Sequence, residues 1–433
     1  MASRYIPLWN GNREESSSAT GPGWRLPKRW LSVLLGIFGI LATLSLLSRD
    51  GDQTPRPQAT QQQDSTLPAT STLPYLLGPH EDGTKLWFPP PPQPGTETPF
   101  QPAVAPYNLP PAISQRPRTP LFIAFTRNTA MLEQTVLSYI AAGWPREDII
   151  VVDNSGTMDA NSLGLLTPKN AFFLDYVLLR RRYGVSILQT PTLLSFAQLM
   201  NFYLRVSMAH GWRYFFWSHM DVAVLSDEDA KPYKSFYARV LEILGTDLHV
   251  SALHDDIPGN GDEWALKYFT YDWLTLVNVA AWRKIGAWDP FVPYYATDCD
   301  AYSRVALNGL TKDDVRAGRI FDLPDAIQDV EHKFFPPADG AEQPGSQRYR
   351  ALVAELEALE RQKPETHRNS WQGVSDGGKG EPWTYDPRGF QKMWWAMAEK
   401  GRDMYRLKWG TQECRLDEHG VELRDAWKED SNE

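Results

Sequence analysis

Two aspartates in the second half of the chain have the residue types and spacing that suit proton transfer. They stand in the run Thr297-Asp298-Cys299-Asp300, and Arg304 follows four residues after the second acid. On an extended segment the two acids would alternate, whereas at a helix start the backbone amides would stabilise their negative charge. Close carboxylates raise one another's pKa, which suits one of them for abstracting a proton.

A third carboxylate, Asp221, follows the apolar run Tyr214-Phe-Phe-Trp217 after three intervening residues. A hydrophobic strand that ends in a carboxylate presents an oxygen ligand to a divalent cation, and such a cation neutralises a diphosphate leaving group. Asp221 is therefore a candidate metal ligand. The alternative is a loop aspartate that only caps or turns the chain.

The elements that must position these residues alternate between short apolar runs and longer helical patterns. The pattern predicts strands at 121–125, 149–152, 185–188, 214–217 and 320–323, and helices at 129–142, 194–210 and 347–362. Such alternation indicates βαβ units, and so an α/β fold with a mostly parallel sheet flanked by helices. In such sheets ligands bind at the carboxyl ends of the strands.

Polar residues follow three of these predicted strands: Thr126, Arg127, Asp153, Asn154, His219 and Asp221. No glycine-rich dinucleotide fingerprint or Walker loop follows any of them, which disfavours dinucleotide binding and nucleoside-triphosphate cleavage. The acid at the second strand's tip, Asp153, could instead bind a nucleoside.

The later part of this region resembles the second signature of the GT-A (Rossmann-like) glycosyltransferases, particularly glycosyltransferase family 2 and its relatives. That signature has a Gly-x-x-Asp turn, an acid-Asp-x-Asp-x-x-x-Arg run and a later glycine. The matching positions are Gly286, Asp289, Asp298, Asp300, Arg304 and Gly309. The order Asp153, Asp221, Asp298 also resembles the family's series of nucleoside acid, Asp-x-Asp motif and acceptor-side base. The resemblance covers about residues 119–336.

The resemblance implies sugar transfer from a nucleotide-sugar donor to a glycan, protein or lipid acceptor, with inversion at the anomeric carbon. Asp298 would take the proton of the acceptor hydroxyl, while Asp221, His332 and a cation would stabilise the departing diphosphate. His332 lies where several GT-A enzymes have a late histidine; its alternative is a surface or hydrogen-bonded histidine. The residues implied at the nucleotide are Thr126, Arg127, Asp153, Asn154 and His219.

The resemblance also gives Asp300 and Arg304 a supporting role. An Asp-Arg pair within one helical turn can lock the loop that carries the base, and we favour this role over direct substrate contact.

Two positions depart from the family pattern. His219 stands at the first acid of the Asp-x-Asp place, and Thr297 replaces the leading acid of the second signature. Imidazole with carboxylate suits Mn²⁺ better than Mg²⁺. The departures also favour an alternative, a catalytically silent GT-A-like protein that binds glycans or scaffolds other transferases. A third class, a phosphate- or sugar-processing hydrolase, would need a second metal cluster or a nucleophile elbow, and the sequence shows neither.

An uncharged run of about 18 residues, 30–47, is long enough to span a bilayer once. Arg25, Lys28 and Arg29 precede it, so the positive-inside rule predicts a cytosolic tail at 1–29 and a lumenal bulk, as in a single-pass type II protein. A cleaved signal peptide is disfavoured by the length and the lack of a small-x-small site, and a core helix by the lack of an amphipathic stripe. The short span favours the Golgi membrane, with the endoplasmic reticulum as alternative.

The distribution of proline and tryptophan divides the rest of the chain into three expected parts. Of the 34 prolines, 16 lie within 51–118, so we expect a disordered stalk at 48–118 ahead of the catalytic domain at 119–337. A Pro-rich recognition segment is the alternative. A helical, Trp-rich extension is expected at 338–433; its tryptophans could cover a core edge or contact lipid or carbohydrate.

The net charge of −9 argues against nucleic acid as a partner, and the 2 cysteines allow one disulfide but no cysteine-based zinc site.

Overall fold

The computed structural model describes residues 85–89, 100–111, 116–252, 264–336, 343–363, 380–382 and 386–428. All of them belong to one compact unit, Thr72–Glu433, whereas the unit Met1–Ser71 lies outside the described residues. The expected cytosolic tail and membrane span are therefore outside the part that the structure describes. Within that part, no helix has the length and apolar character needed to cross a membrane.

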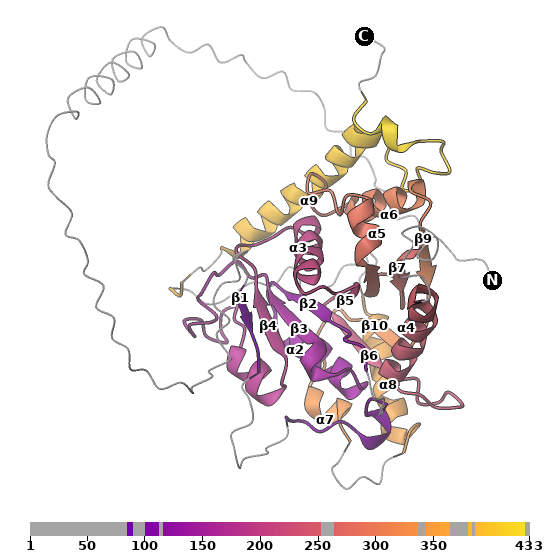
Figure 1. Cartoon of the computed structure of the whole chain (residues 1–433). Coiled ribbons are helices and arrows are strands. Elements are labelled where there is room, and N and C mark those ends of the chain that lie inside the picture. Colours follow the sequence, from indigo (N-terminus) through magenta and orange to yellow (C-terminus); the bar gives the residue numbers. More distant parts are fainter. Residues whose placement is uncertain are drawn as a thin grey trace, which may run out of the picture. The chain divides into compact units, whose positions relative to one another are not determined.

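An eight-stranded mixed sheet forms the centre of this unit, with strand order β1-β4-β3-β2-β5-β8-β7-β9 (Figure 1). The strands are β1 (Lys85–Trp87), β2 (Leu121–Phe125), β3 (Ile149–Asp153), β4 (Ser186–Gln189), β5 (Tyr214–Ser218), β7 (Trp264–Tyr268), β8 (Leu274–Asn278) and β9 (Thr311–Asp314). The neighbours from β4 to β5 are parallel, as are β7 and β9, and the other pairs are antiparallel. The mostly parallel sheet expected from the sequence is confirmed.

A second, two-stranded sheet pairs β6 (Val222–Leu225) with β10 (Arg319–Asp322). The α-helices of the described residues are α2 (Thr129–Ala141), α3 (Phe196–Ala209), α4 (Phe236–Ala252), α5 (Val279–Lys284), α6 (Thr297–Leu307), α7 (Val330–Phe334), α8 (Gln347–Glu360) and α9 (Pro387–Trp409). Short helical turns are η1 (Pro106–Asn108), η2 (Arg146–Asp148), η3 (Leu178–Arg182) and η5 (Leu423–Asp425).

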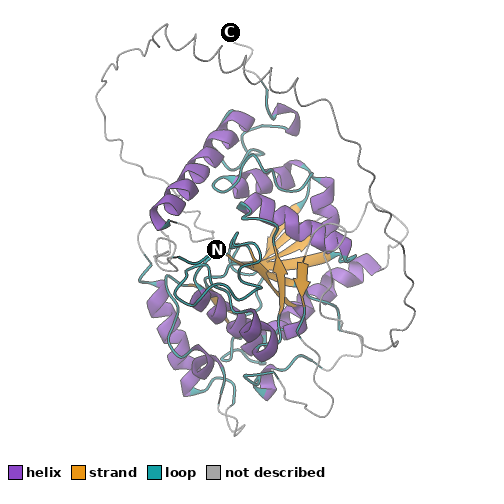
Figure 2. Ribbon diagram, turned by 90° about the vertical axis from the view of Figure 1, so that its left-hand side faces the viewer, coloured by secondary structure: helices purple, strands orange, loops and turns teal. Residues whose placement is uncertain are grey.

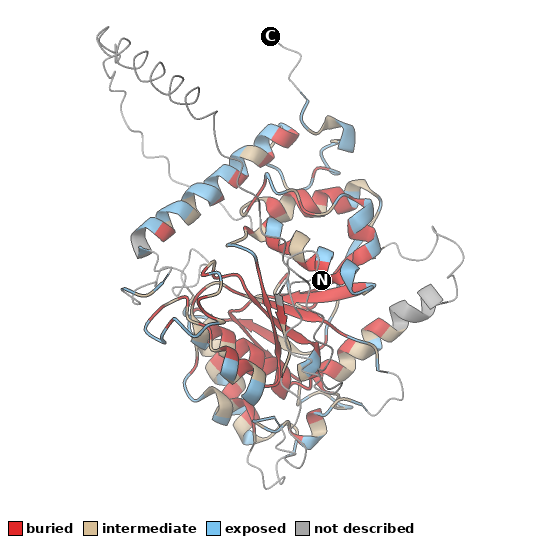
Figure 3. Ribbon diagram, turned by 60° about the vertical axis from the view of Figure 1, so that its left-hand side comes forward, coloured by how far each residue is buried: buried red, intermediate tan, exposed pale blue. Residues whose placement is uncertain are grey.

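Helices cover both faces of the central sheet, so its strands are buried on each side (Figures 2 and 3). Along β2, Leu121, Ile123 and Phe125 join one core, where α2, α4 and α8 also contribute. Phe122 joins the other core, with α3, α5 and α6. Successive side chains of a strand point to opposite faces, so a run with no polar residue is what a strand between two helical layers requires.

Part of the expected stalk belongs to the sheet. β1 pairs antiparallel with β4, and Leu86 is buried. Further along, Asn108 is buried, and its side-chain oxygen accepts hydrogen bonds from Ser226 and Tyr233. A Pro-rich segment cannot bury a core of its own, but short parts of it can add to a core built by other elements.

The end of the chain packs both on itself and on the rest of the same unit. Phe390, near the start of α9, contacts Phe172 in the loop after β3, and Trp409 at the end of α9 contacts Asp300 in α6. Gly401 lies against the backbone before α6, where a Cβ atom would be 2.6 Å from the carbonyl oxygen of Tyr295. The outer surface of α9 is largely exposed (Figure 3).

Candidate active site at the carboxyl edge of the sheet

The parallel strands β2, β3, β4 and β5 bring their carboxyl ends to one edge of the sheet, and most of the expected site residues lie there. Thr126 and Arg127 follow β2, Asp153 ends β3, and His219 follows β5. The placement of these residues at one edge is what the sequence predicts. The side chains that hydrogen-bond to them come from other elements and were not predicted from the sequence.

The carboxylate of Asp153 is engaged by the protein on both oxygens. Oδ1 accepts hydrogen bonds from the Ser155 backbone N–H and hydroxyl, at 3.1 and 2.5 Å. Oδ2 accepts from the Tyr176 hydroxyl at 3.0 Å and from the Asn161 amide at 3.2 Å. Burial raises the pKa of Asp153, and these hydrogen bonds oppose that rise. Contact with a nucleoside would have to share the four lone-pair sites that these donors use.

Asn154 fixes the entry to α3. Its side-chain oxygen accepts a hydrogen bond from the Leu194 N–H at 2.8 Å, and its amide donates to the Leu194 carbonyl at 3.0 Å. A capping box at Ser195 and Gln198 then starts the helix. Asn154 thus holds a loop at the sheet edge.

Arg127 is buried at this edge with its guanidinium 4.7 Å from the ring centre of Phe390 in α9. Burial lowers the pKa of Arg127 to about 10, and Tyr294 opposes this. The side chain is therefore still cationic at neutral pH, which suits an anionic ligand. Thr126 beside it is half-buried.

The turn after β5 is anchored from two sides. The Thr135 hydroxyl of α2 lies within hydrogen-bond distance of the carbonyls of Met220 and Val222, at 2.7 and 2.8 Å, and can donate to either. The backbone N–H of His219 donates to the Trp273 carbonyl at 3.1 Å, which joins this turn to the β7–β8 turn. As a result the His219 imidazole lies between two carboxylates, Nδ1 3.7 Å from Asp221 and Nε2 3.7 Å from Asp272.

Asp272 is the residue that the sequence analysis missed. It lies in the β7–β8 turn, 9% exposed, and burial raises its pKa to about 6. His219 opposes that rise and Asp298 adds to it. The Tyr271-Asp272-Trp273 turn belongs to no pattern that would have marked it; the only available signal was an acid between two apolar runs.

Asp298 lies in the first turn of α6, half-buried, as expected for a helix start. Burial raises its pKa, while its own N–H and that of Cys299 lower it. The charge of Asp298 raises the pKa of Asp272, and also those of Tyr268 and Tyr302. The structure therefore groups residues from three segments, the turn after β5, the β7–β8 turn and the start of α6. We call these residues the edge cluster: His219, Asp221, Asp272 and Asp298.

Asp300 and Arg304 form the ion pair that their spacing predicts. Arg304 Nε donates to Asp300 Oδ2 at 2.9 Å, and its Nη1 donates to the Ile285 carbonyl at 2.9 Å. The other oxygen, Oδ1, lies 2.7 Å from Lys408 Nζ and 2.9 Å from Trp409 Nε1. Asp300 is fully buried, and protein donors engage both of its oxygens.

His332 is placed on α7, where it is exposed. This helix packs against α2, and the His332 carbonyl accepts a hydrogen bond from Arg348 of α8 at 3.2 Å. The described contacts of this helix are therefore with α2 and α8. Among the described residues, no group of three or more His, Cys, Asp or Glu side chains is arranged to hold a metal ion.

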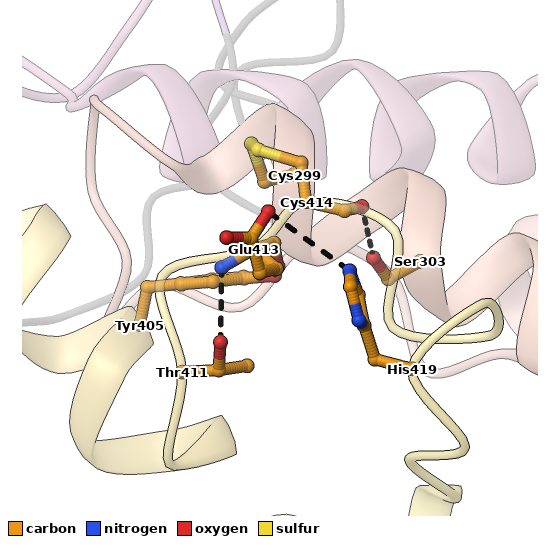
Figure 4. Close-up of a disulfide and its surroundings, with 7 residues drawn as sticks. All are labelled: Cys299, Ser303, Tyr405, Thr411, Glu413, Cys414 and His419. Atoms are coloured by element: carbon orange, nitrogen blue, oxygen red, sulfur yellow. Dashed lines mark hydrogen bonds and ion pairs between the residues drawn. A yellow bond between two sulfur atoms is a disulfide. The ribbon is translucent and has the colours of Figure 1, made fainter. Parts of the chain in front are cut away.

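The two cysteines form a disulfide next to the edge cluster. Cys299 in α6 is bonded to Cys414, with Cα atoms 4.7 Å apart across 115 residues of sequence (Figure 4). The Ser303 hydroxyl donates to the Cys414 carbonyl at 2.7 Å, and the Tyr405 hydroxyl donates to the Glu413 carbonyl at 2.5 Å. Cys299 is thus neither a free thiol nor a nucleophile here.

Comparisons with known proteins assign no family to the chain. No protein-family model matches it, and no curated protein does either. One similar solved structure is a cytidylyltransferase from Leptospira borgpetersenii, 10% identical, with a TM-score of 0.31, over 57% of this chain and 98% of that one. Another is a mannosyltransferase from Pyrobaculum calidifontis in complex with GDP-Man and Mn²⁺, 12% identical, with a TM-score of 0.29, over 68% of this chain and 76% of that one. Likenesses this distant assign no activity.

Proposed function

We propose that this protein is a glycosyltransferase that moves a sugar from a nucleotide-sugar donor to a hydroxyl of a glycan, protein or lipid. The observation that carries the proposal is the edge cluster. Its half-buried base candidate, Asp298, and its carboxylate after β5, Asp221, come from segments far apart in the sequence. They belong to one cluster with Asp272. A buried cation, Arg127, lies at the same edge of the sheet.

In the proposed reaction, the oxygen of the acceptor hydroxyl attacks the anomeric carbon from the side opposite the diphosphate. The new C–O bond forms as the bond to the diphosphate oxygen breaks, and the hydroxyl proton passes to the Asp298 carboxylate. The configuration at the anomeric carbon is inverted. Burial raises the pKa of Asp298, and a more basic carboxylate accepts the proton more readily. Arg127 would face the nucleotide with a full positive charge.

A divalent cation is a separate part of the proposal. Asp221 and His219 are the side chains suited to hold Mn²⁺, and Asp272 lies 3.7 Å from the other imidazole nitrogen of His219, but the described residues include no three such side chains arranged around one metal position. The residues present thus do not form a complete site by themselves, and the reaction above includes no metal step. The nucleotide-binding experiment is therefore run with and without Mn²⁺.

The proposal is tested by thermal unfolding of the full chain in detergent with UDP, GDP, CMP or dTDP. A ligand at about 100 times its Kd stabilises the folded state by about 2.7 kcal/mol, which raises the melting temperature. We expect one nucleotide to raise it. A shift that needs Mn²⁺ would support Asp221 as a ligand, and a shift without Mn²⁺ would remove the metal from the proposal. No shift with any nucleotide would contradict a nucleotide-sugar donor.

One observation favours the alternative, a catalytically silent protein that binds glycans or scaffolds other transferases. Protein donors engage both oxygens of Asp153, the expected nucleoside acid. The two functions differ in turnover. Release of nucleotide from UDP-glucose, GDP-mannose, CMP-sialic acid or dTDP-glucose supports the enzyme, whereas glycan binding without release supports the alternative.

We also propose that the chain is anchored by residues 30–47 as a type II protein of the Golgi membrane, with the endoplasmic reticulum as alternative. The sequence of that span and its flanking cations support the orientation. The Cys299–Cys414 disulfide agrees with a lumenal location, because such bonds persist in oxidising compartments.

A further inference from the structure

We infer that the end of α9 and the loop after it act as a clasp that positions Asp298, with Lys408 as the main positioning residue. We call residues 401–416 the C-terminal clasp. The inference rests on the proposed function, because Asp298 is the proposed base. It gives the C-terminal part of the chain a place in the reaction although none of its residues is proposed to touch substrate.

Lys408 joins two segments that flank the loop before the base. Its ammonium lies 2.7 Å from Asp289 Oδ2 and 2.7 Å from Asp300 Oδ1. Asp289 begins the 290–296 loop, and Asp300 lies in the first turn of α6, two residues after Asp298. One buried ammonium, on a residue 6% exposed, therefore closes this loop at both ends.

Further contacts of the clasp fall on the same few residues. Cys414 is bonded to Cys299, the neighbour of Asp298, and its carbonyl accepts a hydrogen bond from Ser303. Val292 of the 290–296 loop is buried in one cluster with Tyr405, Trp409 and Leu416. Gly401 approaches the Tyr295 carbonyl so closely that no side chain fits between them.

The start of α6 lacks the local device that usually fixes a helix start. Ala296 is its N-cap residue, with a φ of 65° in the left-handed region, and its methyl group makes no capping hydrogen bond. Apart from the Arg304–Asp300 pair, the first turn, which carries Asp298, therefore depends on contacts from outside the helix. The described contacts that do so most directly come from the C-terminal clasp.

The carboxylates of Asp289 and Asp300 make Lys408 the residue of the clasp whose loss should disturb the loop most. Asp289 and Asp300 each place an oxygen 2.7 Å from the same nitrogen, so without the ammonium the two carboxylates would repel across a short gap. Arg304 would still hold Asp300, but Asp289 would lose the described ion pair that links it to α6. The 290–296 loop would then move relative to α6, and a shift of about 1 Å at a reacting group can cost roughly a hundredfold in rate.

The test compares Lys408→Met with Lys400→Met, an exposed lysine on the same helix, both in the full-length chain. The first readout is amide hydrogen exchange of peptides covering 290–307. We expect Lys408→Met to speed exchange there by at least about tenfold, as for a locally loosened segment, and Lys400→Met to leave it unchanged.

The second readout is nucleotide release from the four nucleotide sugars with water as acceptor. We expect Lys408→Met to lower kcat by roughly a hundredfold while the KM of the donor stays unchanged. Lys408→Arg, which keeps a cation between the two carboxylates, should recover most of the rate. If Lys408 only stabilised the fold, its replacement would lower the melting temperature but would not lower kcat at an unchanged KM.

A second variant keeps the test decisive if Lys408→Met does not fold. Gly401→Ala places a Cβ atom against the Tyr295 carbonyl and pushes α9 away from the loop without burying a charge. Faster exchange over 290–307 supports the clasp even if no donor is turned over, in which case the proposed function alone fails. Unchanged exchange in the folded variants, or unchanged kcat in Lys408→Met, would overturn the inference.

Discussion

Asp298 and Asp272 are both carboxylates with raised pKa values, yet the chain presents them differently. Asp298 is half-buried at a helix start, where two backbone amides favour its ionised form. Asp272 is 9% exposed in a tight turn and faces an imidazole. A group that must meet an acceptor has to be reachable, so the exposure of Asp298 fits the role of base better than the burial of Asp272 does.

The replacement Asp298→Asn should abolish most turnover while the protein still binds its nucleotide. Asparagine has nearly the same shape but cannot accept a proton, and loss of a general base costs about 10²- to 10⁴-fold in rate. Initial rates of nucleotide release and the thermal shift with nucleotide measure the two effects. Asp417→Asn, an exposed carboxylate outside the edge cluster, is the matched control. An unchanged rate in Asp298→Asn would contradict the assignment of the base.

Asp272 should make the stability of the protein depend on pH. Its pKa is about 6 in the folded state against an ordinary value of 3.8, so folding favours the protonated form. The stabilisation is complete below pH 4 and is lost as the pH rises through 6, a difference of roughly 3 kcal/mol. Asp272→Asn cannot ionise, so it should match the natural protein near pH 4 and be more stable at pH 7 to 8. Urea unfolding across pH 4 to 8 measures this, and a pH-independent difference would contradict it.

At the site, the sequence could predict pairs that are close along the chain but not those brought together by folding. Asp300 and Arg304 are four residues apart on one helix, so their ion pair follows from helix geometry. His219 and Asp272 meet because β5 and β8 are adjacent antiparallel strands, and that pairing is a property of the sheet order. The joint role expected for Asp221 and His332 stays a prediction, since both the turn that carries Asp221 and the helix that carries His332 pack against α2.

At the scale of elements, the strands and helices between 121 and 218 follow their sequence patterns closely. The predicted strand at 149–152 is β3 (Ile149–Asp153), and the predicted helix at 129–142 is α2 (Thr129–Ala141). β3 is buried along its whole length and α2 along most of its length, so each was recognised as an apolar run of strand or helix length bounded by polar or turn residues. β1 escaped prediction because it has 3 residues and stands within Pro-rich sequence. Its stability depends on pairing with β4.

The buried part of β1 should therefore contribute to stability although it lies in the expected stalk. Leu86 is 6% exposed and packs in the core that α3 and α5 also line. Leu86→Ala should lower the free energy of unfolding by about 2 to 4 kcal/mol through lost burial and a residual cavity. Leu109→Ala, at a leucine 54% exposed in the same Pro-rich stretch, should change it by less than about 0.5 kcal/mol. Equal effects of the two replacements in urea unfolding would show that β1 does not hold its place in the sheet.

At the scale of the whole molecule, the disulfide and the cations before residues 30–47 both bear on which side of the membrane the folded part lies. The Cys299–Cys414 bond closes 115 residues of sequence and joins α6 to the end of the chain. Closing a loop of about 100 residues stabilises a fold by about 4 to 5 kcal/mol when the compartment keeps the bond oxidised. The bond would be reduced in the cytosol, so the proposed orientation and the disulfide support each other.

The proposed type II orientation can be tested by protease accessibility. With Arg25, Lys28 and Arg29 retained on the cytosolic side, the rest of the chain is expected in the lumen. In sealed microsomes, protease should remove a tag at the N-terminus but not one at the C-terminus. Both cysteines should resist a maleimide reagent in denatured samples until a reducing agent is added.

Replacing the three cations with glutamate removes the charge bias and should allow part of the population to insert the opposite way. Those molecules should lose the protection of the C-terminal tag and also contain free thiols. A protected N-terminal tag on the unaltered chain would contradict the type II orientation.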